Sequence, residues 1–424
     1  MAETPLFTFV HCADLHLDSP FVGLHALAPE ISGVLREATF KAFNNVVDLA
    51  IRQEAKILIV AGDVYDGTDR SLRAQLHFRD ALRRAVDAGI QCCVAHGNHD
   101  PLSGWEAGLK MPAAVHRFSG EEVERVSVRA GGETVAHVYG LSFPVREVRE
   151  NLAGRFRRDA DGPFAIGVLH CNVGGNPQHD NYAPCTIEDL VACGMDYWAL
   201  GHVHTRQVLR ESLPCIVYPG NTQGRSLREE GARGCYLVRV DTAGGVRQEF
   251  VPTDVVRWYV DEVDISGLNT MDDLLQALAA TVDQARARAD GRGAIMRVRV
   301  TGRGDLHGTL KRVEPDRDLA RPLREGEGGR EDFVWVESVE VATRPALDLD
   351  QRRQVEDFTG DFLRAAERLR TAGDPGDALR EVLAKRPEQR LIANELSRLS
   401  DADLLDLLSE SEILGLDYLL RDEA

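Results

Sequence analysis

Residues 56–66 read KILIVAGDVYD, an apolar run that ends in a glycine and two aspartates. Five consecutive apolar residues without alternation predict a strand that is buried on both faces of a sheet. Gly62 permits a tight turn after this strand, so Asp63 would stand at its carboxyl end. Because α/β proteins collect ligands at the carboxyl ends of strands, this stretch predicts both a fold and the location of a site.

The same pattern recurs four times in the first 204 residues. Each further strand is followed or ended by histidine, aspartate or asparagine. These predicted strands are residues 6–12, 91–95, 164–170 and 197–200. The spacing of apolar residues predicts amphipathic helices over 36–54 and 71–88. This alternation of strands and helices is typical of a layered α/β domain with parallel neighbouring strands.

The strands that follow residue 200 lie close together in the sequence and suggest a meander. They are predicted at residues 215–218, 234–240 and 248–252, with a glycine-rich turn between the last two. Together with a strand at 135–141, they fit two sheets packed face to face and flanked by helices. The sequence therefore predicts a four-layer α/β/β/α sandwich over residues 1–253.

The composition changes after residue 253. Strands and one helix predict a small α+β domain over residues 254–345, which would cap the first domain. Residues 316–332 are rich in Arg, Glu, Asp and Gly and are expected to form an exposed connection. Residues 346–424 are expected to be helical. Their leucine-rich segment 400–420 must bury its apolar side, either on its own domain or on a partner protein.

Charge and composition limit the classes of protein to which the chain can belong. The net charge of −18 argues against non-specific adhesion to nucleic acid, although bound divalent cations would reverse the local field in a site. No apolar run is long enough for a membrane span, and we expect no signal peptide. The eight cysteines include no CxxC pair, so we expect buried, reduced thiols in a cytoplasmic protein.

The polar residues that follow the strands form a donor set of carboxylate, amide and imidazole groups without a thiolate. Such mixed donors suit two divalent ions, and we expect Mn²⁺, with Mg²⁺ and Fe²⁺ as alternatives. Two cations bridged by a carboxylate can activate a water and hold a phosphate. A single such residue is more often an ordinary polar group in a loop, but five clusters in series favour a metal site. The candidate ligands are Asp14, His16, Asp63, Asn98, His170, His202 and His204.

The clusters D-L-H, G-D-V-Y-D, G-N-H-D, H and G-H-V-H resemble, in this order, the motifs of the calcineurin-like metallophosphoesterase superfamily. The resemblance covers about residues 6–253 and implies that Asp63 bridges two metals. It implies that the other ligands of one metal are Asp14, His16 and His204. It implies that the other ligands of the second metal are Asn98, His170 and His202.

The same resemblance implies roles for three residues near the ligands. His99 corresponds to the catalytic histidine, which contacts the phosphate and protonates the leaving oxygen. Asp66 and Asp100 correspond to carboxylates that orient the ligands.

Residues 11–20 (HCADLHLDSP) and 218–228 (YPGNTQGRSLR) resemble the YhaO-type DNA repair exonucleases, which are relatives of the bacterial nuclease SbcD. This resemblance implies a metal-dependent phosphodiesterase that acts on DNA as an exonuclease. It also implies a partner, an SbcC-like coiled-coil ABC ATPase, which in this family binds the tail of the nuclease. Arg225 and Arg228 are candidates for contact with substrate phosphate, because arginine binds phosphate through two hydrogen bonds. No membrane partner is expected, and a homodimer stays open.

Two alternatives remain for the function. One is a small-molecule phosphodiesterase or phosphatase of the same superfamily, and the other is a scaffold protein in which partner binding matters more than catalysis. Protein Ser/Thr phosphatases continue the second motif into an Arg-Gly pair that binds phosphate. Here Asp66 is followed by Gly-Thr-Asp, which disfavours that class of phosphatase.

Overall fold

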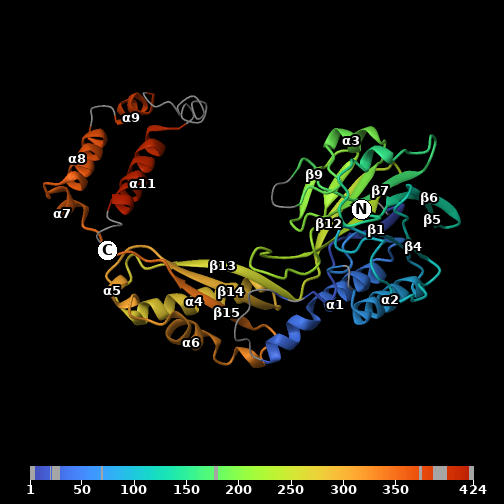
Figure 1. The fold of residues 1–424 in the computed structure, drawn as a ribbon, viewed down its shortest axis with the longest axis horizontal. Coiled ribbons are helices and arrows are strands. Elements are labelled where there is room, and N and C mark those ends of the chain that lie inside the picture. Colours follow the sequence, from blue (N-terminus) through green and yellow to red (C-terminus); the bar gives the residue numbers. More distant parts are fainter. Residues whose placement is uncertain are drawn as a thin grey trace. The chain divides into compact units, whose positions relative to one another are not determined.

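The structure is a computed structural model that describes most of the chain. The described residues are 5–19, 21, 29–67, 70–175, 180–371, 375–384 and 399–419. The chain divides into two compact units, which Figure 1 draws as a ribbon. The first unit comprises Met1–Asp264, Thr270–Thr301 and Arg312–Ala342, and the second comprises Ile265–Asn269, Gly302–Lys311 and Thr343–Ala424.

The first sheet of unit 1 is centred on β2 (Ile57–Ala61), which is buried along its whole length. The sheet has the order β12-β11-β1-β2-β3-β4, and the last four strands run parallel. The other strands are β1 (Phe7–Cys12), β3 (Gln91–Ala95), β4 (Val115–Arg117), β11 (Gly234–Val240) and β12 (Val246–Pro252). Helices α1 (Pro29–Arg52) and α2 (Leu72–Asp87) cover one face of this sheet, where Phe43 and Leu82 pack on Leu58.

The second sheet has the order β5-β6-β7-β8-β10-β9, and its strands from β6 to β10 run parallel. Its strands are β5 (Glu124–Ala130), β6 (Glu133–Leu141), β7 (Phe164–His170), β8 (Tyr197–Gly201), β9 (Gln207–Arg210) and β10 (Cys215–Tyr218). The apolar side chains of both sheets, such as Ile59 and Val168, form a common core between them. The outer face packs against the helical turn Ala153–Arg155 and α3 (Ile187–Ala192). These layers confirm the predicted α/β/β/α sandwich.

Sequence patterns missed three short or half-exposed strands, β4, β5 and β9. Strand β5 alternates buried or half-buried positions with exposed ones and lies at the edge of its sheet, where charged residues face solvent. Strand β4 has only three residues, and every position of β9 is half-buried. Edge strands such as β5 and β9 do not need the long apolar runs that made the central strands predictable.

A three-stranded parallel sheet completes unit 1. It consists of β13 (Val256–Asp264), β14 (Gly293–Thr301) and β15 (Val334–Val341), and α4 (Met271–Ala289) connects the first two strands. Thr270 caps α4 by accepting a hydrogen bond from Asp273 N, whose carboxylate accepts one in return from Thr270 N. Ile31 and Leu35 of α1 pack on Trp258 of β13, so this sheet shares a core with the sandwich.

Residues 316–332 connect β14 to β15 and are mostly exposed, as the sequence predicts. The prediction did not include the helical turns that the segment forms at Pro315–Ala320, Arg321–Arg324 and Glu327–Gly329. Leu319 and Ala320 are buried there. Glu327 is also buried, because it pairs with Arg286 at 2.8 Å and accepts a hydrogen bond from Val334 N. A charged composition therefore concealed three residues that pack in the core, and the one buried charge among them is paired.

Unit 2 is largely helical where the structure describes it, and the prediction of helices within residues 346–424 is confirmed for the described residues. Its helices are α5 (His307–Leu310), α7 (Leu349–Arg353), α8 (Phe358–Arg370), α9 (Pro375–Ala384) and α11 (Asp401–Leu419). Residues 385–398 of the predicted helical region lie outside the described residues. Leu404 and Leu416 of α11 are buried, and the buried Glu412 pairs with Arg370. Among the helices that the structure describes, none is both long enough and apolar enough to span a membrane.

Candidate metal centre

The carboxyl ends of β1, β2, β3, β7 and β8 meet at one place and bring the predicted ligands together. The loops after β1 and β2 are joined by backbone hydrogen bonds, from Asp14 N to Gly62 O and from His16 N to Asp63 O, each of 3.0 Å. His202 N, after β8, donates to the carboxylate of Asp14. The loops of both sheets are therefore fixed to one another at the site.

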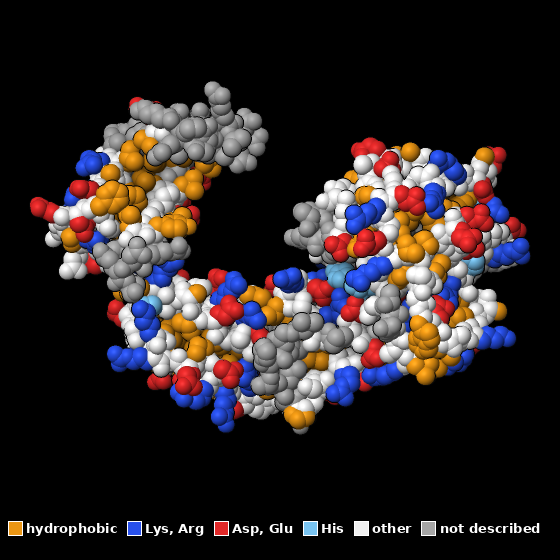
Figure 2. Space-filling view, in the orientation of Figure 1, with side chains coloured by type: hydrophobic (Ala, Val, Ile, Leu, Met, Phe, Trp, Pro, Cys, Tyr) orange, Lys and Arg blue, Asp and Glu red, His pale blue; other side chains and the backbone are white. Residues whose placement is uncertain are grey.

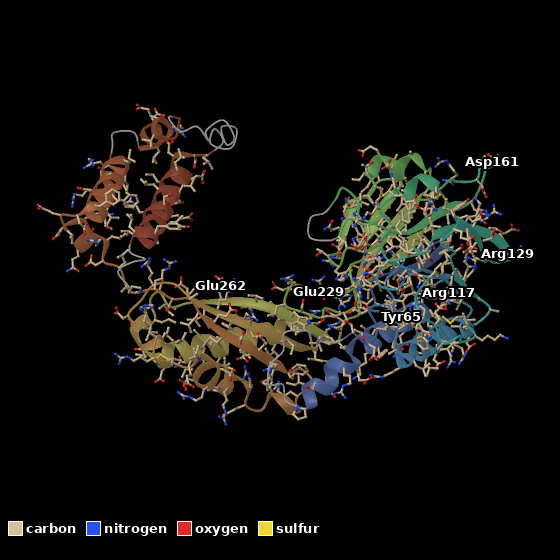
Figure 3. All side chains as sticks on the ribbon, viewed as in Figure 1. Tyr65, Arg117, Arg129, Asp161, Glu229 and Glu262 are labelled. Atoms are coloured by element: carbon tan, nitrogen blue, oxygen red, sulfur yellow. The ribbon has the colours of Figure 1, made fainter. Side chains whose placement is uncertain are left out.

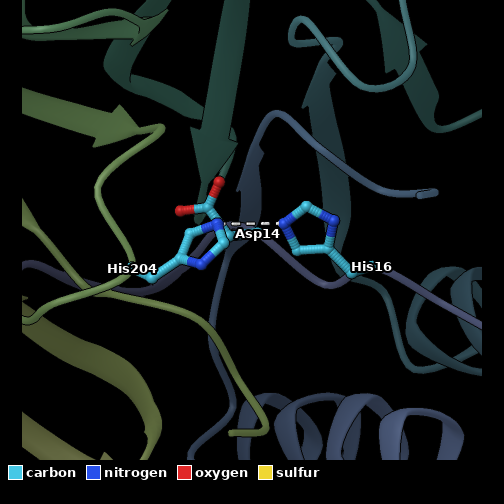
Figure 4. A group of neighbouring side chains, drawn as sticks. All are labelled: Asp14, His16 and His204. Atoms are coloured by element: carbon cyan, nitrogen blue, oxygen red, sulfur yellow. Dashed lines mark hydrogen bonds between the residues drawn. The ribbon is translucent and has the colours of Figure 1, made fainter. Parts of the chain in front are cut away.

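One group of candidate ligands consists of Asp14, His16 and His204, which Figure 4 shows. The Nε2 atoms of His16 and His204 lie 3.1 Å apart. Glu229 holds the other ring nitrogen of His204, Nδ1, at 2.6 Å. The carboxylate therefore keeps a proton on Nδ1, and Nε2 of His204 faces His16 as an electron-pair donor.

A second group surrounds His170. Its Nδ1 donates to the carbonyl oxygen of Ala61 at 3.0 Å, and its Nε2 lies 3.1 Å from Oδ1 of Asn98. Oδ2 of Asp63 is 3.4 Å from the same Nε2 and 3.9 Å from Nε2 of His16. Nδ1 of His202 lies 3.2 Å from Oδ1 of Asn98. Asp63 thus lies between the two groups, as a bridging ligand requires.

This arrangement of donors fits divalent cations. Nε2 of His170 faces two oxygen atoms, and this contact requires either a proton on Nε2 or a cation between the atoms. Ligand atoms that bind one cation at about 2.1 Å lie roughly 3 Å apart, close to the separations observed here. All seven candidate ligands are buried except His204, which is half-buried.

The charges of the buried carboxylates also call for a cation. Burial lowers the pKa of His170, but the charge and hydrogen bond of Asp63, the charge of Asp14 and the hydrogen bond to Ala61 together raise the pKa to about 9. In the metal-free protein a proton on His170 therefore balances part of the negative charge. A divalent cation would supply that charge more fully and would displace the proton.

His99 differs from the candidate ligands because its side chain is 36% exposed. Its backbone N donates to Asp63 at 2.9 Å, while its Nδ1 lies 2.9 Å from Oδ1 of Asp66. Burial lowers the pKa of His99, but the hydrogen bond with Asp66 and the nearby carboxylates raise it overall. The imidazole can therefore carry a proton at the rim of the site.

The two predicted orienting carboxylates occupy different positions. Asp66 holds His99 and lies 3.4 Å from Nδ1 of His16. Asp100 accepts hydrogen bonds from Val64 N and Gly97 N at 3.0 and 2.8 Å. Asp100 therefore fixes the backbone of two loops that carry candidate ligands.

The two candidate phosphate-binding arginines also differ. Arg225 Nη1 donates to Ser19 Oγ at 2.9 Å and lies 3.2 Å from Oδ2 of Asp66, so it holds the carboxylate that orients His99. Arg228 is exposed and lines a cavity of about 780 Å³ that also reaches His204. Of these two arginines, Arg228 is the one whose side chain extends toward open space beside the site.

Sequence reasoning missed Glu229, His96 and Ser19. Glu229 lies 25 residues from His204 in the chain, and no local pattern signals their contact. His96 directly precedes the G-N-H-D cluster, and its Nδ1 lies 2.8 Å from Asp100. Ser19 donates to Asp66 at 2.6 Å from within the segment 11–20. The resemblance of residues 11–20 to the YhaO-type exonucleases is the one sequence signal that includes Ser19.

The glycines of three clusters surround the ring of His170. A Cβ atom on Gly62 would lie 2.2 Å from Nδ1 of His170, and one on Gly97 would lie 2.7 Å from Nε2. A Cβ on Gly201 would lie 1.8 Å from the carbonyl oxygen of Ala61. The glycines are therefore required by the close approach of the ring to three loops.

Backbone strain is concentrated in the same loops. Four candidate ligands adopt positive φ angles. Each such angle costs a residue other than glycine on the order of 1–3 kcal/mol. The four ligands are Asp14 (52°), His16 (43°), Asp63 (49°) and His202 (100°). Such clustering is typical of sites where geometry is held for function at the expense of local stability.

Comparisons with known proteins agree with this geometry. The calcineurin-like phosphoesterase family matches residues 7–206, and the middle domain of metallophosphoesterase YhaO matches residues 258–344. The chain is 36% identical over 409 residues to the uncharacterized metallophosphoesterase YhaO of Bacillus subtilis, covering 96% of each chain.

More distant relatives are nucleases or repair proteins by name. The chain is 30% identical to the DNA double-strand break repair protein Mre11 of Aeropyrum pernix, covering 55% of this chain and 58% of the relative. It is 25% identical to SbcD, a component of the nuclease SbcCD of Bacillus subtilis, covering 52% of this chain and 63% of the relative. The chain thus spans about three fifths of the length of these two relatives.

The Gly97→Ala variant should lose metal affinity by at least about tenfold, because its Cβ would lie 2.3 Å from Oδ1 of Asp63. Gly33→Ala is the matched control, since Gly33 is exposed in α1 with no atom within 4 Å of its Cβ position. Titration of both variants with Mn²⁺ measures the effect. Wild-type affinity in Gly97→Ala would contradict the geometry described for His170 and Asp63.

The Glu229→Gln variant should bind metal about 10–100-fold more weakly, because the charge that orients His204 is lost. Burial opposes ionisation of Glu229, but His204 lowers its pKa to about 2, so the wild-type side chain is charged at neutral pH. Glu230→Gln is the control, since glutamine can still accept the hydrogen bond from Val260 N. Equal metal affinity in both variants would show that Glu229 is not needed to orient His204 for metal binding.

Proposed function

The chain belongs to the calcineurin-like phosphoesterase family, and we propose that it is a two-metal phosphodiesterase that acts on DNA as a repair exonuclease. The observation that carries the proposal is the convergence of five loops on one cluster of donors, in which Oδ2 of Asp63 lies 3.4 Å from Nε2 of His170 and 3.9 Å from Nε2 of His16. Phosphoester hydrolysis follows from the family. The polymer substrate and the exonuclease activity are our inference.

We assign the ligands in two sets that share one carboxylate. Asp14, His16 and His204 would hold one metal with Asp63. Asn98, His170 and His202 would hold the other with Asp63. The two ions, for which we propose Mn²⁺, would lower the pKa of a water molecule and neutralise phosphate charge.

Side chains of the protein would then hold the imidazole of His99 in position and protonate the leaving oxygen. His99 stands at the rim with a raised pKa, and we propose that it donates a proton to the leaving oxygen. Asp66 would hold the imidazole in place for this transfer, and Arg225 and Ser19 would hold Asp66. We propose that Arg228 contacts the phosphate backbone beyond the site.

The DNA substrate is supported by the relatives Mre11 and SbcD. Figure 2 shows Lys and Arg interspersed with Asp and Glu over the visible face, without a broad basic surface. A chain with a net charge of −18 has little long-range attraction for DNA. We therefore propose that an SbcC-like coiled-coil ATPase supplies much of the grip on DNA.

The surface proposed for this ATPase is on α11. Leu407, Leu414 and Tyr418 lie at helical spacing and are 44%, 57% and 61% exposed, while Leu404 and Leu416 are buried. The helix therefore packs on its own unit with one side and presents apolar residues on another. Exposed apolar side chains in such a row suit a protein partner.

Two further proposals concern organisation and location. We divide the chain into a nuclease domain (1–253), a capping domain (254–345) and a helical region (346–424). All eight cysteines are buried and free of disulfide bonds, which suits a reducing compartment such as the cytoplasm.

His99→Ala should lower DNA cleavage by about 10²–10⁴-fold and leave both metals bound. The contact between residue 99 and Asp63 runs through the backbone N, which alanine retains. Asp63→Ala should abolish metal binding and activity together. Metal content and cleavage are measured on the same preparations, and loss of both metals in His99→Ala would exclude the role that we assign to His99.

A substrate panel with Mn²⁺ separates the DNA proposal from its alternatives. Linear double-stranded DNA, single-stranded DNA, cyclic nucleotides and p-nitrophenyl phosphate are compared side by side. We expect turnover of DNA from its ends. Turnover of the small substrates alone would indicate a small-molecule phosphodiesterase or phosphatase, and turnover of none would favour a scaffold role.

Leu414→Ser combined with Tyr418→Ser should reduce retention of an SbcC-like ATPase in a pulldown at least about tenfold, as expected for central apolar contacts. Deletion of residues 401–424 should have the same effect. Glu410→Ser, an exposed change on the same helix, is the control. Unchanged retention in the double variant would show that the exposed side of α11 does not bind the ATPase.

A further inference from the structure

Trp105 is the exposed member of the four tryptophans. It is 55% exposed, whereas Trp198, Trp258 and Trp335 are buried. Trp105 follows the G-N-H-D cluster and is six residues from His99. Fully extended, six residues span at most about 20 Å, so the Cα atom of Trp105 lies within that distance of the Cα atom of His99.

The exposure of Trp105 does not come from a loosely held loop. Leu102 N donates to Phe143 O at 2.9 Å, and Ser103 N donates to Pro144 O at 3.1 Å. On the other side, Ala107 N donates to Oε1 of Gln75 at 2.9 Å. The backbone on both sides of Trp105 is therefore hydrogen-bonded to neighbouring segments, while its side chain is exposed to solvent.

Ion pairs beneath the loop fix its residue 106. Glu106 lies 2.6 Å from Nη1 of Arg70 and accepts a hydrogen bond from Nη1 of Arg117 at 3.0 Å. Arg70 Nη2 also donates to the carbonyl oxygen of Asp100, in the cluster that carries His99. Figure 3 labels Arg117 and Tyr65, which line a small cavity of about 20 Å³ under this loop. The network connects Trp105 rigidly to the catalytic loop.

The charge around Trp105 suits a polyanion. The neighbouring carboxylate of Glu106 is neutralised by its two arginines. Lys110 and Arg146 are exposed, and Arg146 is two residues from Pro144, which holds the loop.

The exposed area of the Trp105 ring matches a single nucleobase better than a protein surface. In residues 101–112, Trp105 is the one large apolar side chain that is exposed, and Ser103, Gly104 and Gly108 leave space around it. A stable protein interface covers about 800 Å² on each partner, far more than one ring supplies. A nucleobase presents a flat surface that matches a single indole.

We propose that Trp105 stacks on an unpaired base of the DNA strand that the metal centre hydrolyses. The inference rests on the proposed function and narrows it, because a base inside a duplex is already stacked on both faces. The substrate would therefore be a single strand or a frayed end. Stacking is tolerant of sequence, since every base has a π-face.

Binding of oligothymidylate to metal-free protein tests this site without cleavage. Because the other tryptophans are buried, quenching of tryptophan emission during the titration reports mainly on Trp105. Trp105→Ala should weaken binding by about 5-fold to 100-fold, and Trp105→Phe should recover most of the affinity. Leu72→Ala is the control, since Leu72 is 51% exposed. Hydrolysis of p-nitrophenyl phosphate should stay unchanged in Trp105→Ala if wild type turns it over.

The outcomes separate this inference from the function on which it rests. If wild type degrades DNA and Trp105→Ala binds oligothymidylate as tightly as wild type, the stacking site is refuted while the nuclease stands. If wild type degrades no DNA, the proposed function fails first. If Trp105→Ala instead lowers retention of the coiled-coil ATPase with unchanged DNA affinity, Trp105 is a protein contact and the proposal is wrong.

Discussion

The imidazole of His170 lies where the two sheets meet, and both of its ring nitrogens are committed. Nδ1 is held by the carbonyl oxygen of Ala61 at the end of β2, and Nε2 faces Asn98 and Asp63. Three glycines leave just enough room for this ring. His170 belongs to β7 of the second sheet, whereas Ala61, Asp63 and Asn98 belong to strands and loops of the first sheet. The candidate site therefore depends on the packing of the two sheets against each other.

The buried carboxylates concentrate negative charge in the same region. Asp14 and Asp63 are both buried, and burial raises the pKa of Asp14. A site that holds such carboxylates and several imidazole donors is stabilised by a cation and strained without one. The positive φ angles of four candidate ligands add to this strain, so metal binding and local stability should be coupled.

The central strands could be predicted because each is an uninterrupted apolar run, and β2, β3 and β7 begin or end within one residue of the expected positions. The edge strands β5 and β9 lacked that signal. The candidate ligands could be named from five clusters, and their assignment to two metals stays a prediction. The contact between His204 and Glu229 could not be predicted, because only folding brings residues of separate loops together.

The arginines illustrate a similar limit. Sequence reasoning assigned Arg225 and Arg228 the same role because both are arginines of the segment 218–228 and arginine can bind phosphate through two hydrogen bonds. In the structure Arg225 is engaged by Ser19 and Asp66, whereas Arg228 extends toward the cavity beside His204. Residue type indicates that an arginine can bind phosphate, but the internal acceptors that compete for its guanidinium are known only from the fold.

The central claim is that one buried carboxylate, Asp63, is shared by two cations. Anomalous diffraction from crystals of the protein soaked in Mn²⁺ tests it most directly. We expect two peaks, one among Asp14, His16 and His204 and the other among Asn98, His170 and His202, both in contact with Asp63. A single peak, or two peaks of which only one contacts Asp63, would contradict the account.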